Sequence, residues 1–201
     1  MNNNFIITIP ARFKSSRLPG KPLKDICGKA MIHHVWDICI NAVSRKKVVV
    51  LTDDYRIKNY CIKNDINYSM TSSKCKTGTD RIYEYAKENK YNYYINVQGD
   101  EPLIDPKHIL DVLKFTINQK TITNCYSMCS KKEYLSKNIP KVVVSDNKDL
   151  LYMSRAPIPA CKNNQIPKKF YKQICIYGFP RKSLLKFGKY DKKSSNENYE
   201  D

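Results

Sequence analysis

The sequence predicts an α/β fold with a largely parallel, mixed sheet and a small antiparallel insertion. Short apolar runs at 5–10 and 48–52 are typical of strands that are buried on both faces. Segments with helical spacing of apolar residues separate these runs, which indicates right-handed βαβ units. After residue 120 the expected strands follow one another with fewer helices between them, and this change predicts the antiparallel insertion.

The first half begins with a strand at 5–10 and a loop at 11–24. The next expected element is a helix whose apolar face is formed by Ile32, Val35, Trp36, Cys39 and Val43. A strand at 48–52, a polar helix at 55–63 and a strand at 66–70 follow it. These segments therefore repeat the strand–helix pattern of a parallel sheet.

Capping residues mark the starts of two further helices. Thr77 and Asp80 have the spacing of a capping box, and the helix they open carries Ile82, Tyr85 and Ala86. Asp105 is the expected N-cap of the second helix, with Pro106 at its first position. The core-facing residues expected on that helix are Ile109, Leu110, Leu113 and Ile117. A strand at 93–98 lies between the two helices.

The second half is expected to be mostly strand. Apolar and β-branched residues predict strands at 121–129, 141–144, 150–153 and 173–179. A length of 201 residues predicts one domain, 1–201. The charged tail at 189–201 has no apolar period, and we expect it to be loose.

The formal net charge of +17 raises the question of a polyanionic partner. Lysines are frequent along the whole chain, which favours solvated surface over a nucleic-acid patch. No RRM, KH or helix-turn-helix motif is found. We therefore expect no nucleic-acid partner, while a basic polyanion- or RNA-binding protein stays open as an alternative.

The eight cysteines include no CxxC pair, and no Cys/His cluster has zinc-finger spacing. No secretory leader precedes the first strand, and no apolar run approaches the ~18 residues of a membrane span. These patterns predict a reduced, cytoplasmic protein without membrane contact.

Two segments follow strands at the edge where open α/β sheets bind their ligands. The loop at 10–22 holds four cations, two serines and Gly20, as a triphosphate site requires, although an ordinary basic loop has the same composition. It has neither Walker A nor dinucleotide-fingerprint spacing. In the second segment, 98–102, Asp100 is either a ligand for Mg²⁺ or a cap of the next turn.

At this point the sequence resembles a known family. The runs that carry the resemblance are IPARFKSSRLPGKPL at 9–23, KTGTDR at 76–81, NVQGDEP at 96–102, KVVVSDNKDLLYMSRAPIP at 141–159 and IYGF at 176–179. They resemble the signatures of the 3-deoxy-manno-octulosonate cytidylyltransferases. The sialic-acid cytidylyltransferases have a looser version of the first run, so a cytidylyltransferase for a sialic-acid-like sugar is the alternative enzyme.

The resemblance implies a three-layer nucleotide-binding fold of the nucleotide-diphospho-sugar transferase type. It also implies transfer of CMP from CTP to the anomeric hydroxyl of 3-deoxy-D-manno-octulosonate, an acidic keto-sugar, for lipopolysaccharide or capsule biosynthesis. Pyrophosphate leaves and Mg²⁺ assists. Residues 1–120 are the expected nucleotide-binding half, and residues 121–188 are the expected half for sugar binding and homodimerisation.

The resemblance also assigns roles to individual positions. Arg12, Lys21 and Asp100 are the expected catalytic residues, and Asp100 is the expected metal ligand. The expected nucleotide contacts are Pro10, Ala11, Arg12, Ser16, Arg17, Lys21, Thr77, Gly78, Thr79, Arg81 and Gln98. The expected sugar contacts are Gln98, Arg155, Gln173 and Tyr177, and for Arg155 a role in supporting the fold stays open as an equal alternative.

The chain departs from the family pattern in two places. Gln173 stands where the family has the histidine of H-x-G-I-Y, which makes an amino- or otherwise altered octulosonate an alternative sugar. Family chains continue past the equivalent of Asp201, through a V-D-T-x-x-D-like segment with a second magnesium aspartate. We therefore expect this chain to bind CTP but to turn over poorly and self-associate, and a non-catalytic relative is a further alternative.

Overall fold

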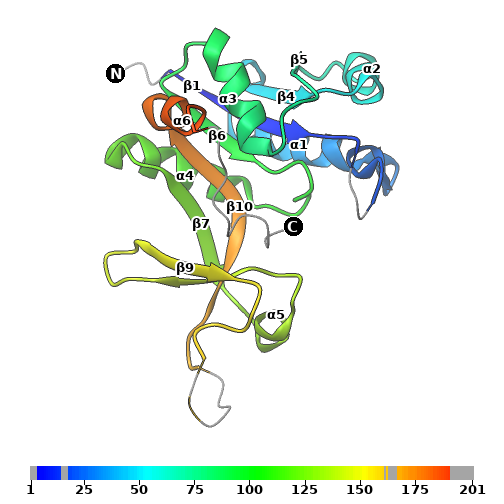
Figure 1. Cartoon of the computed structure of the whole chain (residues 1–201). Helices are drawn as coiled ribbons and strands as arrows, with labels where there is room; N and C mark the ends of the chain where they lie inside the picture. Colours follow the sequence, from blue (N-terminus) through cyan, green and yellow to red (C-terminus); the bar gives the residue numbers. More distant parts are fainter. Residues whose placement is uncertain (1–3, 15–17, 161, 163–166, 191–201) are drawn as a thin grey trace. The chain divides into compact units, whose positions relative to one another are not determined.

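The computed structural model describes residues 4–14, 18–160, 162 and 167–190. The chain divides into two compact units, unit 1 at 1–123 with 176–201 and unit 2 at 124–175. Figure 1 labels most of the helices and strands. The elements are in order β1 (Phe5–Ala11), η1 (Lys21–Leu23), β2 (Asp25–Ile26), β3 (Lys29–Ala30), α1 (Met31–Ala42), η2 (Arg45–Lys47), β4 (Val48–Thr52), α2 (Tyr55–Lys63), β5 (Tyr68–Met70), α3 (Gly78–Glu88), β6 (Tyr93–Val97), α4 (Pro106–Gln119), β7 (Thr123–Met128), α5 (Lys131–Leu135), β8 (Lys141–Val144), β9 (Leu150–Ser154), β10 (Tyr171–Pro180) and α6 (Arg181–Phe187).

Unit 1 contains the predicted parallel sheet. Its strands lie in the order β5-β4-β1-β6, and the neighbouring pairs are all parallel. The C-terminal part of β10 adds an antiparallel strand to β6, with Gly178 opposite Ile95. β1 is central, and all its residues from Ile6 to Ala11 are buried, as its continuous apolar run predicts. The mixed, largely parallel α/β architecture predicted from the sequence is confirmed.

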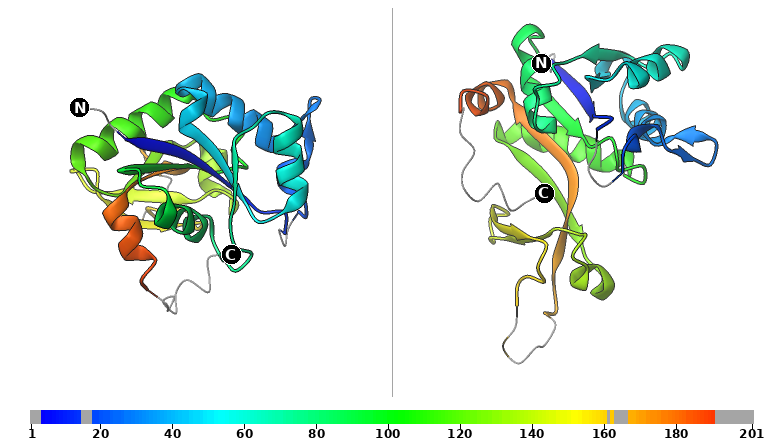
Figure 2. Two further views of the ribbon diagram at one scale, coloured as in Figure 1. Left: turned by 90° about the horizontal axis from the view of Figure 1, so that it is seen from above. Right: turned by 45° about the vertical axis from the view of Figure 1, so that its right-hand side comes forward.

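Helices cover both faces of this sheet. Helices α1 and α4 contact each other on one face, and α3 and α6 contact each other on the opposite face, as the left view of Figure 2 shows. Strand alternation explains this arrangement, because successive side chains point to opposite faces. The carboxyl ends of β1, β4 and β6 meet at one edge of the unit, where the predicted nucleotide segments begin.

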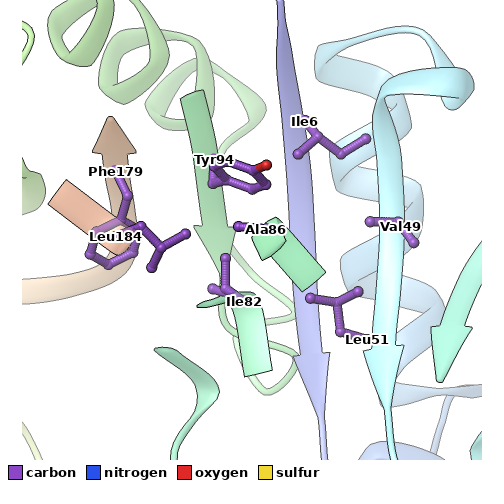
Figure 3. Packing of buried hydrophobic residues seen from close by; sticks show 8 residues of the cluster. All are labelled: Ile6, Val49, Leu51, Ile82, Ala86, Tyr94, Phe179 and Leu184. Atoms are coloured by element: carbon purple, nitrogen blue, oxygen red, sulfur yellow. The ribbon is translucent and has the colours of Figure 1, made fainter. Parts of the chain in front are cut away.

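One hydrophobic cluster fills the space between the sheet and the second pair of helices. Figure 3 shows its members, which are Ile6 on β1, Val49 and Leu51 on β4, Tyr94 on β6, Phe179 on β10, Ile82 and Ala86 on α3, and Leu184 on α6. Most of these side chains are entirely buried. Full burial of an aliphatic side chain contributes about 1.5–3 kcal/mol. The cluster therefore fixes α3, and with it the turn at the start of α3, against the sheet.

Helix α4 was predicted with the right caps but with a slightly different buried face. Asp105 accepts a hydrogen bond from the Lys107 amide and Pro106 is at the first position, as expected. The buried residues are Ile109, Val112, Leu113 and Thr116, whereas Leu110 and Ile117 are only partly buried. The physical reason lies in β10, where a Cβ on Gly178 would overlap the hydroxyl groups of Thr116 and Thr123. Because Gly178 has no side chain, the paired hydroxyl groups of Thr116 and Thr123 fit against it, and the buried face of α4 therefore includes Thr116.

Unit 2 is an antiparallel assembly. Strand β8 pairs with β9 on one side and with the first residues of β10 on the other, with Val142 opposite both Met153 and Tyr171. The short helix α5 was not predicted, although the spacing of Ser130 and Glu133 is that of a capping box, and the box is formed. Unit 2 therefore corresponds to the antiparallel insertion, while the roles expected for the two halves of the chain stay predictions.

Helix α6 and the hairpin of β2 and β3, both in unit 1, were not predicted either. Helix α6 follows β10 directly, and β2 and β3 form a hairpin closed by Cys27 and Gly28, which both have positive φ. Glycine adopts that backbone conformation at little cost. In the described part of the chain, no helix combines the length and apolar character needed to span a bilayer.

Candidate active site at the carboxyl edge of the parallel sheet

Three of the singled-out segments meet at Pro10, the residue before the end of β1. A Cβ placed on Gly99 would lie 3.0 Å from the Pro10 carbonyl oxygen and 3.1 Å from Ile32 Cδ1. A Cβ on Gly78 would lie 3.4 Å from the Pro10 ring. Glycine at both positions lets the backbone after β6 and the first turn of α3 approach the end of β1. The sequence motifs around Pro10, Gly78 and Gly99 thus form one surface.

Lys21 and Asp100 form an ion pair at this surface. Lys21 Nζ lies 2.6 Å from Asp100 Oδ2, and the two side chains are 35% and 44% exposed. Lys21 begins the 3-10 turn η1, and Asp100 follows the end of β6. The sequence predicted both as catalytic residues, and the structure brings them together. Their exposure leaves the pair accessible to an arriving ligand.

Arg12 extends the cationic side of the site. It follows β1, is exposed, and donates from Nη1 to the carbonyl oxygen of Lys76 at 3.4 Å. This contact links the loop after β1 to the segment before α3. Ala11, by contrast, is 3% exposed and offers chiefly its backbone. The predicted nucleotide residues Ser16 and Arg17 lie outside the described residues.

The loop after β1 is held in place by Phe13. The Phe13 carbonyl accepts a hydrogen bond from the Gly20 amide at 2.9 Å, and a Cβ on Gly20 would lie 2.9 Å from the Phe13 ring. On α2, the guanidinium carbon of Arg56 lies 3.3 Å from the ring centroid. Asp54 fixes that guanidinium with bonds of 2.9 and 2.7 Å. Gly20, with φ of 72°, and Arg56 therefore both pack against Phe13.

The first turn of α3 contributes backbone donors. Thr77 is the N-cap, and its side chain and that of Asp80 form the predicted capping box. Gly78 and Thr79 follow as the first helical residues. The free N–H groups of a helix N-terminus, together with the helix dipole, favour an anionic group. Thr77, Gly78 and Thr79 are therefore placed at the same edge as Lys21 and Asp100.

Arg81 is buried, unlike an exposed side chain that contacts a ligand directly. Its side chain is 3% exposed, with Nη2 3.3 Å from Asp53 Oδ1 and Nη1 donating to the Thr71 hydroxyl. Asp53 follows β4, and Thr71 follows β5. Sequence reasoning missed both partners, although Asp53 has the same signal as Asp100, an aspartate soon after a parallel strand. Arg81 thus ties α3 to the ends of two strands.

Strand β6 contributes two amides near this edge. Gln98 directly follows the strand and is partly exposed. Asn96, two residues earlier and so on the same face, is 1% exposed. Within the described residues the Asn96 amide oxygen has no hydrogen-bond partner. Sequence reasoning singled out Gln98 and gave no role to Asn96, although Asn96 begins the motif at 96–102.

The remaining predicted sugar residues fall in both units. Tyr177 is in unit 1, opposite Asn96 in the sheet, and its ring stacks on Phe179 with centroids 6.2 Å apart. Gln173 is in unit 2, where its amide donates to Asn124 Oδ1 at 3.4 Å. Arg155, also in unit 2, is exposed and donates from Nη1 to the Asn138 carbonyl at 2.9 Å. The structure therefore holds each of these side chains through its own local contacts.

The fit of a magnesium ion is judged at Asp100, the exposed carboxylate that pairs with Lys21. Among residues 4–14, 18–160, 162 and 167–190, no group of three or more His, Cys, Asp and Glu side chains is arranged to hold a metal ion. Mg²⁺ commonly takes one or two carboxylates and fills its other positions with phosphate oxygens and water. A single exposed carboxylate beside cationic groups therefore fits an ion that arrives with a phosphate ligand.

Comparison with known proteins agrees with this picture. The family model described as Cytidylyltransferase matches residues 6–201. The chain is 37% identical over 185 residues to 3-deoxy-manno-octulosonate cytidylyltransferase of Escherichia coli, covering 90% of this chain and 74% of that protein. It is 36% identical over 188 residues to the protein of the same name from Elusimicrobium minutum strain Pei191, covering 90% and 76%.

Two solved structures are similar in fold. A structure described as CMP:2-keto-3-deoxy-manno-octonic acid synthetase complexed with CTP has a TM-score of 0.85 and 34% identity, covering 97% of this chain and 81% of that one. A cytidylyltransferase from Leptospira borgpetersenii serovar Hardjo-bovis (strain JB197) has a TM-score of 0.62 and 19% identity, covering 94% and 66%. The second likeness bears on the fold alone.

Proposed function

The chain belongs to the cytidylyltransferase family, and from this premise we propose that it transfers CMP from CTP to 3-deoxy-D-manno-octulosonate. The observation that carries the proposal is the Lys21–Asp100 pair at the surface where the segments around Pro10, Gly78 and Gly99 meet. This surface combines cations, a carboxylate and helix N–H groups, which are the groups that a magnesium–triphosphate ligand requires.

The proposed reaction is a nucleotidyl transfer. The oxygen of the sugar's anomeric hydroxyl forms a bond to the α-phosphorus of CTP and loses its proton to solvent. The bond from the α-phosphorus to the bridging oxygen breaks, and pyrophosphate leaves with that electron pair. Such a transfer depends on positioning and on neutralising the charge that develops on the leaving group. Arg12 and Lys21 supply that charge, and Arg17 is proposed to add to it.

Asp100 is proposed to hold the magnesium ion together with triphosphate oxygens. When bound, the ion neutralises phosphate charge and acts as a Lewis acid toward the phosphoryl oxygens. Lys21 supports Asp100 before the ligand arrives, because its ammonium group lies against the carboxylate. The same ammonium is then close enough to the site to pair with a phosphate oxygen instead.

The nucleotide is proposed to lie along Pro10, Ala11 and the first turn of α3. Thr77, Gly78 and Thr79 offer helix N-terminal donors, Gln98 offers an amide, and Ser16 is proposed to add a hydroxyl. In this proposal Arg81 acts indirectly, by supporting α3, because its guanidinium is buried against Asp53 and Thr71. Ala11 contributes backbone groups because its side chain is buried.

The sugar acid is proposed to contact Gln98, Arg155, Gln173 and Tyr177. A guanidinium such as that of Arg155 matches a carboxylate in two parallel hydrogen bonds. Gln173 keeps hydrogen-bonding capacity at the family's histidine position but does not titrate. We therefore propose an octulosonate as the acceptor, with tolerance at the position that Gln173 contacts.

A second copy of the chain is the proposed partner of strand β9. This strand is at the end of the strand order, and Leu150, Leu151 and Tyr152 are 52%, 63% and 63% exposed. Exposed apolar side chains on an edge strand are typical of a protein–protein contact. We propose a homodimer formed through unit 2, acting in the cytoplasm, where CTP is available.

Pyrophosphate release tests the proposal. The protein is mixed with Mg²⁺ and each of CTP, UTP, ATP and GTP, with 3-deoxy-D-manno-octulosonate or a sialic acid as acceptor. We expect release that needs both CTP and the octulosonate, and a larger increase in Tm with CTP than with ATP. Equal stabilisation by all four nucleotides, or release with the sialic acid alone, contradicts the proposal.

A further inference from the structure

We propose that Lys141 is a positioning residue for Arg155, holding it ready for the sugar carboxylate; this inference rests on the proposed function. Lys141 is the first residue of β8, and Arg155 is the residue directly after β9. Both belong to unit 2. Lys141 begins the motif at 141–159, but neither charge nor periodicity distinguishes it from its neighbours in the sequence.

The Lys141 ammonium is enclosed by backbone carbonyls. The residue is 0% exposed, and Nζ donates to the carbonyl oxygens of Ser136, Ile139 and Arg155 at 2.6, 2.7 and 2.5 Å. A lysine ammonium has three N–H donors, so these bonds use all of them. Three carbonyls replace the water that a charged group otherwise requires. The three carbonyls therefore satisfy every N–H donor of the ammonium group.

These bonds hold both ends of Arg155. Its carbonyl oxygen is fixed by Lys141, and its guanidinium donates from Nη1 to the carbonyl of Asn138 at 2.9 Å. Asn138 lies in the same turn as Ser136 and Ile139, which Lys141 also binds. Only one of the five guanidinium N–H donors is used by Asn138. The turn and Lys141 together limit where the exposed guanidinium can point.

Burying the Lys141 ammonium costs free energy of desolvation, and the packing of its side chain alone does not explain why a charge is placed there. Burial lowers the pKa of Lys141; Cys129 acts in the opposite direction, and the positive charge of Arg155 adds to the lowering. An apolar residue of similar length avoids the desolvation of a charge, and such replacements are often neutral or stabilising in other proteins. What an apolar residue cannot do is bind three carbonyls at once. The ammonium thus fixes a geometry, and a side chain held in its bound geometry loses less entropy on binding.

The first test is a double-mutant cycle of Lys141→Met and Arg155→Gln, with Lys131→Met on an exposed position of α5 as the control. We expect Lys141→Met to raise the KM for the octulosonate about tenfold, with the Kd for CTP changed less than twofold. The double variant should have the same KM for the octulosonate as Arg155→Gln alone, because both changes remove the same interaction. Strictly additive effects, or an unchanged sugar KM in Lys141→Met, overturn the inference.

Chemical rescue is the second test. Lys141→Ala leaves a space next to three carbonyls, and added n-propylammonium should lower its sugar KM toward the wild-type value. Lys141→Met fills that space and should not respond, and tetramethylammonium, which has no N–H donor, should rescue neither variant. Equal responses of the two variants, or rescue by tetramethylammonium, contradict an ammonium that acts through hydrogen bonds to carbonyls.

Hydrogen exchange separates this inference from the proposed function. Without any ligand, Lys141→Met should speed amide exchange at 136–139 and 154–156 and leave α3 and β6 unchanged. If the wild-type protein turns over no octulosonate, the proposed function fails, and the exchange measurement still judges whether Lys141 orders the Arg155 segment. Unchanged exchange at 136–139 and 154–156 shows that Lys141 does not hold it.

Discussion

The surroundings of Asp100 and of Arg155 differ in how they are fixed. Asp100 follows β6, which pairs in parallel with the central strand β1 in a sheet with helices on both faces, and its neighbours approach through Gly78 and Gly99. Arg155 follows an outer strand of a small antiparallel unit and is held by polar contacts to Asn138 and Lys141. Close packing thus places the first residue, and a buried ammonium places the second.

This difference follows from the size of the two cores. A sheet that is covered on both faces buries long apolar runs, so its strand ends are fixed by packing. Unit 2 has only 52 residues and fewer buried apolar side chains than unit 1. Charged and hydrogen-bonding groups therefore contribute more to holding its segments in place. Changes to packing should therefore disturb the order of unit 1 most, and the loss of internal polar contacts should disturb the order of unit 2 most.

The largest expected effect comes from Asp100→Asn. This change keeps the shape of the side chain and removes the charge that binds Mg²⁺, so we expect turnover to fall about 100-fold or more. Steady-state pyrophosphate release checks it, with Tm showing that the fold is kept. The neighbouring Glu101→Gln is the matched control and should keep most of the activity. Near-wild-type turnover in Asp100→Asn would refute the metal role.

Gly99→Ala tests the close packing at Pro10. The added Cβ meets the Pro10 carbonyl oxygen and Ile32, so we expect a loss of about 1–3 kcal/mol in the free energy of unfolding and weaker CTP binding. Urea unfolding and a CTP titration measure these effects. Gly78→Ala is the control, since its Cβ only reaches ordinary contact distance from Pro10. If both variants are equally stable, the approach of the β6 segment is less tight than the structure indicates.

Arg56→Gln tests the contact that holds the loop after β1. It removes the guanidinium from the Phe13 ring and from Asp54, and with it the cation–π contact and two hydrogen bonds. We expect the Kd for CTP to rise about fivefold while the Tm falls only slightly. Arg45→Gln, which removes the more distant contact with Trp36, serves as the control. An unchanged Kd would mean that Phe13 needs no support from α2.

The smallest expected effect concerns Glu133 in unit 2. Hydrogen bonds from Lys172 and then from the Ser130 amide lower the pKa of Glu133 from 4.5 to about 2. The stability that this carboxylate contributes is complete above pH 4.5 and is lost as the pH falls toward 2. Glu133→Gln should therefore remove about 1 kcal/mol at neutral pH and flatten the acid side of the stability curve. Parallel curves for the two proteins between pH 2 and 5 would argue against it.

Local signals in the sequence were enough to predict much of the nucleotide region. Thr77 and Asp80 are three residues apart, so their capping box is visible in the sequence and is formed. Arg81 is in the same segment, yet its partners Asp53 and Thr71 come from other strands and leave no local signal. The same limit explains the buried face of α4, because the glycine that draws Thr116 inward is Gly178, far along the chain.

In unit 2 the missed features have two different causes. The capping box of Ser130 and Glu133 is a local signal that the strand-rich pattern around it concealed. Lys141 gives no signal at all, because a lysine at a strand start is normally solvated, and its burial depends on carbonyls on both sides of it in the chain. The family resemblance named Arg155 and Gln173, but it did not name the residues that hold Arg155.

The chain enters and leaves unit 2 through β7 and β10, and these two strands pair with each other. The two points where the backbone crosses the boundary, after Thr123 and before Ile176, therefore belong to adjacent strands, so replacing residues 124–175 requires little extra loop closure. Exchange of this segment between relatives would leave β1, α3 and Asp100 uncut. Recombination at these two neighbouring points would thus exchange Arg155 and Gln173, two of the four proposed sugar contacts, without changing the residues proposed for the nucleotide.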